Sequence, residues 1–182
     1  MSLELALIEH GAPTLAGLKP GSLFRHCPAD PEQFVQEFLY CRAQLAGRGV
    51  RLVILKGCRK TGSYLLYLFR QRALEGLLCA GAYRQFLLDA GYLPWESVQG
   101  LLRQLAARLC AEGPFPHEIG VFLGYPLEDI QGFITHKGRN YTLCGCWKCY
   151  GDPREAQRRF DRFPRCTQLY RARYAQRPSI RH

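Results

Sequence analysis

The stretch "VRLVILKG", residues 50 to 57, decides the fold class of this chain. It is short, β-rich and almost wholly apolar, which is typical of a strand covered on both faces. A helix precedes it, because Asp30 can cap a first turn, Pro31 suits the first helical position and Gly47 suits the end. The chain therefore contains strands as well as helices.

Helical patterns dominate the sequence beyond this strand. Apolar periodicity predicts three helices, over about residues 62–78, 82–90 and 95–111. The segment "RNYTLCGCWKCYG", residues 139–151, predicts a second strand, after which Asp152 and Pro153 begin the terminal helices. Without internal repeats or linkers, residues 1–182 are expected to form a single α+β domain, mostly helical with a small sheet.

The composition fits a cytoplasmic globular protein. The chain has 182 residues, of which 47% are hydrophobic and 22% charged. No apolar run approaches the roughly 18 residues of a membrane span, and "MSLELALIEH" lacks the features of a signal peptide, so no membrane association is expected. Nine cysteines are an odd number without an export signal, so most are expected to be reduced.

The net charge of +10 is concentrated in a basic helical segment over about residues 152–182, which holds nine arginines against three acids. Aromatic and small residues recur there at helical spacing, at Ala156, Phe160, Phe163, Tyr170 and Tyr174. Arginines fall on the other side, at Arg154, Arg158, Arg162 and Arg165. This pattern predicts an amphipathic helix pair broken near Pro164. Its basic face is either simply solvated or a surface for RNA or another anionic partner.

The stretch "GPFPHEIGVFLGYPLEDIQGF", residues 113 to 133, predicts two short helices. Pro116 suits the first position of one helix, and Gly124 suits the residue after its end. Pro126 leads into the next, from Leu127 to Thr135.

His117 and Glu118 therefore fall at a helix N-terminus and are candidate site residues. The positive potential there favours a neutral imidazole and an ionised carboxylate. The zinc-protease pattern needs a second histidine at position 121, which is Val121, so that pattern is absent. Asp129, in the next helix, is a further candidate. The alternative is that these residues only stabilise the local structure.

A second candidate site lies in "EHGAPTLAGLKPGSLF", residues 9 to 24. Pro13 suits a helix start, which would place His10 and Gly11 at a strand-to-helix turn with outward backbone N–H groups. The glycines lack the spacing of nucleotide-binding loops. In the structural alternative, Gly11 needs a positive φ and Lys19 is an ordinary surface charge.

A third feature is "CGCWKC", with Cys144, Cys146 and Cys149, and with Cys166 as a fourth thiol further along. Thiols at this spacing are soft ligands for zinc or an iron-sulfur cluster. In a continuous strand, however, the first two share one face and the third points to the other, so they converge only if a glycine breaks the strand. Ordinary packing is the alternative.

The motifs "HGAPTLAGLKPGSLF", "FPHEIGVFLGYPLEDIQGF" and "NYTLCGCWK", with the closing Phe-rich basic helices, resemble the bacterial domain-of-unknown-function family thirty-seven ninety-three, found mainly in anaerobes. The resemblance spans nearly the whole chain. The family pattern is similar to His-Cys-Ala-Pro and Gly-Tyr-Trp-Lys-Val-Tyr, so Gly11 replaces a cysteine, and Cys146 and Cys149 replace tyrosine and valine. The resemblance brings no established activity, and it favours redox or metal traffic.

Three hypotheses for function follow, and whether the chain is an enzyme stays open. The first is a polar site between the His10 turn and the His117/Glu118 helix start, metal- or redox-associated, binding a small molecule or a transition metal. The second is a cysteine-histidine type hydrolase or transferase scaffold, with Gly11 at the position of the nucleophile. The third is an RNA or partner-binding module using the Arg-rich terminus. In the first two, His10 and His117 are expected to meet across one cleft.

Overall fold

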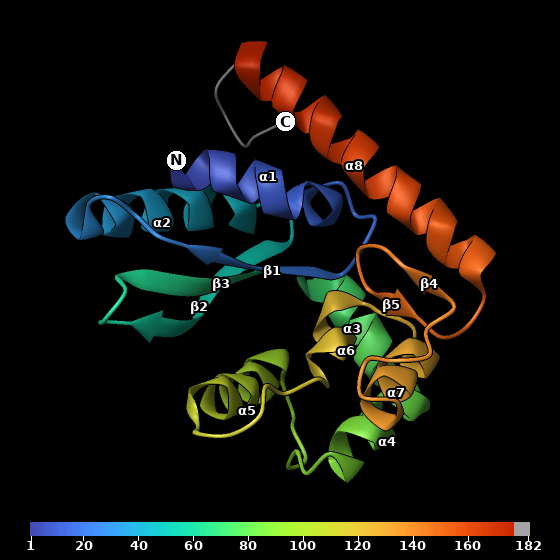
Figure 1. The fold of residues 1–182 in the computed structure, drawn as a ribbon. Helices are drawn as coiled ribbons and strands as arrows, with labels where there is room; N and C mark the ends of the chain where they lie inside the picture. Colours follow the sequence, from blue (N-terminus) through green and yellow to red (C-terminus); the bar gives the residue numbers. More distant parts are fainter. Residues whose placement is uncertain (177–182) are drawn as a thin grey trace.

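A three-stranded antiparallel sheet lies at the centre of the computed structural model, which describes residues 1–176 (Figure 1). The strands are β1 (Gly21–His26), β2 (Val50–Cys58) and β3 (Ser63–Arg70), in the order β1-β3-β2. β3 pairs with both neighbours, and its pairing with β2 shifts register between Ile54 and Lys56. The predicted strand at residues 50–57 is confirmed as β2.

The strand that is covered on both faces is β3, and the prediction of a helix over residues 62–78 is wrong in its first half. Tyr67 and Phe69 pack on one face of the sheet, while Leu66 and Leu68 pack on the other, and all four are nearly inaccessible. Apolar residues at every position satisfy a helical pattern and a central strand equally well. β2 is an edge strand, with Arg51 exposed.

Helices α1 (Leu3–Leu15) and α2 (Pro31–Ala46) cover the face of the sheet that carries Leu66 and Leu68, and the long helix α8 (Pro153–Gln176) lies across α1 (Figure 1). The cap predicted for α2 is confirmed, since Asp30 accepts the N–H groups of the second and third helical residues at 2.8 and 3.2 Å.

Two proline-based predictions are wrong. Pro13 lies inside the last turn of α1, whose N-cap is Ser2, so residues 10–13 form no strand-to-helix turn. Pro164 lies inside α8, which continues through it as one helix instead of a broken pair. Buried residues lie on both sides of Pro164 in α8, at Phe160 and Cys166, so both halves of the helix are packed against the rest of the protein. Residues 177–182 of the predicted basic segment lie outside the described part.

Smaller helices cover the opposite face, where Tyr67 donates a 2.6 Å hydrogen bond from its hydroxyl to the carbonyl of Phe122. They are α3 (Gln71–Cys79), α4 (Gly81–Asp89), α5 (Val98–Cys110) and α6 (Ile119–Leu123). α7 (Leu127–Thr135) follows, and then a hairpin of two short strands, β4 (Leu143–Cys144) and β5 (Lys148–Cys149). A hairpin therefore replaces the single strand predicted over residues 139–151.

The predicted fold class is confirmed: the chain is a mostly helical α+β domain with a small antiparallel sheet. In the part of the chain that the structure describes, no helix combines the length and apolar character needed to cross a membrane.

Candidate functional site

His10 and Gly11 lie on α1, on the face of the sheet opposite to α6 and His117. A Cβ atom placed on Gly11 would come 2.5 Å from a terminal methyl group of Leu68, so this position faces the core. His10 stacks on Phe24, with 5.2 Å between ring centroids. The expectation of one cleft shared by His10 and His117 is therefore wrong, because the sheet separates them.

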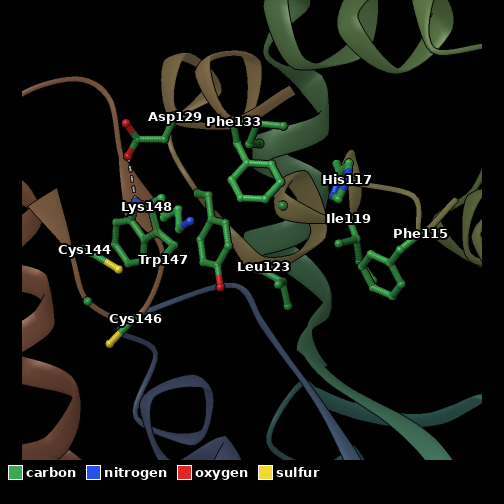
Figure 2. A pocket seen from close by; sticks show the side chains of 14 residues that line it. Phe115, His117, Ile119, Leu123, Asp129, Phe133, Cys144, Cys146, Trp147 and Lys148 are labelled. Carbon is green, nitrogen blue, oxygen red and sulfur yellow. Dashed lines mark hydrogen bonds between the residues drawn. The ribbon is translucent and has the colours of Figure 1, made fainter. Parts of the chain in front are cut away.

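α6 begins at Ile119 and not at Pro116 as predicted, so His117 and Glu118 lie in the turn that leads into it. Their side chains diverge. Glu118 is buried and forms an ion pair with Arg108 at 3.3 Å. The guanidinium group of Arg108 also lies 4.1 Å from the ring centroid of Tyr92. His117 points the other way and packs against Phe133, with 4.9 Å between ring centroids (Figure 2). The two adjacent residues thus do not form one polar site.

Asp129 is a structural anchor. Its carboxylate, in a residue only 3% exposed, accepts a hydrogen bond from the indole of Trp147 at 2.7 Å (Figure 2). It also accepts hydrogen bonds from the backbone N–H groups of Tyr150 and Gly151, at 2.6 and 3.0 Å. Three donors satisfy a buried carboxylate and offset the cost of its desolvation. Asp129 therefore ties the β4–β5 hairpin to α7.

The three cysteines predicted as metal ligands do not gather at one point. Gly145 does break the strand, with a backbone bond to Trp147 closing the turn, but Cys144 and Cys146 are exposed while Cys149 is buried beside the carbonyl of Asp152. Burial raises the pKa of the Cys149 thiol. Within residues 1–176, no group of three or more His, Cys, Asp or Glu side chains is arranged to hold a metal ion.

A pocket of about 390 Å³ lies between α6, α7 and the β4–β5 hairpin (Figure 2). Four aromatic side chains line it: Phe115, Tyr125, Phe133 and Trp147. Tyr125 stacks on Trp147, with 4.8 Å between ring centroids and 24° between ring planes. A concave apolar site of this size with few polar groups is the usual form of a small-molecule pocket. We call it the aromatic pocket.

The polar groups of the aromatic pocket lie at its margins. Lys148 donates a 2.7 Å hydrogen bond to the carbonyl of Gly138, and its ammonium lies 4.9 Å from the ring centroid of Tyr141. The carboxylate of Asp129 is fully engaged by its three donors. His117 stands at the opposite margin (Figure 2). The middle of the pocket therefore favours the apolar surface of a ligand over a charged group.

Four residues that the sequence indicates as candidates for a polar or metal site line this pocket: His117, Asp129, Cys144 and Cys146. The sequence did not indicate its aromatic walls. The aromatic residues come from two loops, the last turns of α7 and a hairpin turn, so they share no periodic pattern. The density of aromatic residues between positions 115 and 150 was the available signal. Lys19 was also missed: it is half-buried beside Tyr125, and burial of its ammonium lowers its pKa to about 8.

Comparison with known proteins gives one result. Residues 7–182 match a family described as "Protein of unknown function (DUF3793)". No curated protein matches the chain. No solved structure matches it.

Proposed function

The chain belongs to the DUF3793 family of proteins of unknown function, and from this premise we propose that it is a small-molecule-binding protein whose aromatic pocket holds a planar, largely apolar ligand. The observation that carries the proposal is the set of four aromatic walls around one cavity of about 390 Å³. Aromatic faces bind flat rings by stacking and edge-to-face contact, in addition to the free energy of burying apolar area.

The construction of the pocket supports a preformed site. Its floor, formed by Trp147, is fixed by the hydrogen bond to Asp129 and by edge-on packing against Phe160, with 4.6 Å between ring centroids. Helix α8, which carries Phe160, can approach the hairpin closely because Gly145 has no side chain. A Cβ atom on Gly145 would lie 2.3 Å from the ring of Phe160. A rigid wall loses little conformational entropy when a ligand binds, which favours affinity.

A small molecule is a better partner for this site than a metal ion. The lining is mainly carbon, and the exposed thiols of Cys144 and Cys146 lie at the rim without a third ligand. A metal- or redox-associated role therefore finds less support here than the binding of an organic ring. A ligand held in this way would contact His117 at one margin and Lys148 at the other.

We expect the neutral probe N-phenyl-1-naphthylamine to bind the protein with saturable fluorescence enhancement, and Phe133→Ala to weaken this binding about ten-fold. The replacement removes one aromatic wall while leaving the anchored hairpin intact. The matched control is Tyr40→Ala, because Tyr40 is an exposed aromatic residue on α2, on the other side of the sheet. Fluorescence titration of the three proteins gives the dissociation constants.

Two results would argue against the proposal. One is a titration without saturation in the unmodified protein. The other is an equal loss of affinity in Phe133→Ala and Tyr40→Ala, which would indicate non-specific adsorption to exposed apolar surface. Far-ultraviolet circular dichroism of each variant verifies that the fold is retained.

A further inference from the structure

A second pocket, of about 330 Å³, adjoins the aromatic pocket and has the opposite character. Three cationic side chains line it: Lys19, Arg159 and Arg162. No aspartate or glutamate is among its lining residues within the described part of the chain. We call it the basic groove. It shares Leu123, Tyr125 and Trp147 with the aromatic pocket, so the two sites have a common wall.

Lys19 is the most informative residue of the basic groove. It lies between α1 and β1 and is half-buried, with its ammonium 5.7 Å from the ring centroid of Phe163 and 6.0 Å from that of Tyr125. Its ammonium makes no hydrogen bond and no ion pair with residues 1–176, and the titratable group that acts on it is the thiol of Cys146, whose own pKa is raised by burial. Aromatic faces compensate only part of the hydration that a cation loses on burial. A partly buried cation without a neighbouring carboxylate is suited to binding an anionic ligand.

The two arginines add charge from α8. Arg159 is paired with Glu155 one turn earlier on the same helix, on the surface, where such pairs are weak and easily exchanged. Arg162 is exposed and makes no hydrogen bond or ion pair with the residues that the structure describes. Guanidinium groups bind carboxylate, sulfonate and phosphate oxygens through parallel N–H donors. The groove thus has one fixed and two adjustable cations.

We infer that the basic groove binds the acidic group of the ligand whose ring occupies the aromatic pocket, so that the ligand is an aromatic acid. This inference rests on the proposed function. Because Leu123, Tyr125 and Trp147 line both pockets, the two sites are neighbours, and an acidic substituent that extends from a bound ring past this wall would reach the three cations. Partial burial strengthens the attraction, because the effective dielectric constant there is lower than in water. The ring supplies apolar contact and the acidic group supplies orientation.

The test compares two probes that differ by one sulfonate group, N-phenyl-1-naphthylamine and 8-anilinonaphthalene-1-sulfonate. At low ionic strength we expect the sulfonate to bind about ten-fold more tightly than the neutral probe. Lys19→Met should reduce this difference, because only the two arginines remain, and should leave the affinity for the neutral probe unchanged, since methionine keeps the apolar stem. Lys60→Met, at an exposed lysine in the β2–β3 turn, is the control and should change neither affinity.

Inorganic phosphate at constant ionic strength distinguishes a tethered acidic group from a separate anion. Competition with the sulfonate probe, and not with the neutral probe, supports a shared subsite. Phosphate binding that leaves both affinities unchanged would overturn the inference, because the groove would then serve a separate anion. Equal affinities of the two probes, or an equal loss of both in Lys19→Met, would overturn it as well.

Failure of the proposed function gives a different result. In that case the neutral probe does not bind at all, whereas phosphate binding to the groove remains measurable on its own. A bound anion favours the ammonium form, so phosphate should raise the pKa of Lys19, followed by the ¹³Cε chemical shift. An unchanged pKa would overturn the anion site independently of the aromatic pocket.

Discussion

Replacement of Asp129 by alanine is expected to lower the free energy of unfolding by about 4 kcal/mol, because one buried and two partly buried donors lose a charged acceptor. The donors are the Trp147 indole, at 2.7 Å, and the backbone N–H groups of Tyr150 and Gly151. The β4–β5 hairpin would lose its tie to α7, and the aromatic pocket its fixed wall. Urea denaturation followed by circular dichroism measures the loss.

Two further variants make this prediction specific to Asp129. Asp129→Asn keeps an oxygen acceptor for the backbone donors but presents an amide N–H₂ group to Trp147, so we expect a smaller loss of about 2 kcal/mol. Asp161→Ala removes an exposed carboxylate on α8 that accepts one side-chain bond from Gln157, and should change stability by less than about 0.5 kcal/mol. Similar stabilities of Asp129→Ala and Asp161→Ala would contradict the anchoring role.

Replacement of Lys19 by methionine should increase the free energy of unfolding, by about 1–2 kcal/mol at pH 7 in a buffer free of phosphate and sulfate. Burial lowers the pKa of Lys19 from 10.5 to about 8, which means that the folded protein bears a cost for keeping this group charged. Methionine removes that cost and keeps the apolar contact with Phe163 and Tyr125. When replacing a residue that lines a pocket stabilises the protein, that residue is typically retained for binding.

The gain in stability from Lys19→Met should depend on pH. Below pH 8 Lys19 is protonated in both the folded and the unfolded protein, so its full cost is present. Between pH 8 and 10.5 Lys19 is mostly neutral in the folded protein and mostly protonated in the unfolded chain. The free energy of unfolding of the unmodified protein therefore rises with pH relative to that of Lys19→Met. The difference in the free energy of unfolding between the two proteins should therefore vanish near pH 10.5. A difference that does not change with pH, or a destabilised variant, would contradict burial of the charge.

Local signals in the sequence predicted much of the fold. Asp30 and Gly124 mark helix boundaries through chemistry that acts within a few residues, and Leu127–Thr135 forms α7 as expected. Gly124 adopts a φ of 75°, which suits glycine, and Pro20 packs where a side chain would stand. β3 could not be predicted in this way, because its strand form depends on pairing with segments on both sides of it in the sheet.

The candidate site was predictable only in part. The sequence indicates the stretch around His117, which lines the aromatic pocket, but the adjacent charged residue, Glu118, turns inward to Arg108. The family pattern has a cysteine at the position of Gly11, but the structure places Gly11 against Leu68 on the far face of the sheet. The walls of the aromatic pocket come from four segments, and their meeting depends on the anchor at Asp129, which is a tertiary contact with no local signature.

The most direct test of the central claim is a two-dimensional ¹H–¹⁵N spectrum of the protein titrated with N-phenyl-1-naphthylamine. The chain has two tryptophans, of which Trp147 lines the aromatic pocket and Trp95 does not, and Trp95→Phe assigns the two indole signals. Ring currents act over a few ångströms, so binding in the pocket should shift the Trp147 indole signal to saturation at one probe per protein and leave that of Trp95 in place. A Trp147 signal that stays still, or a shift confined to Trp95, would contradict the account.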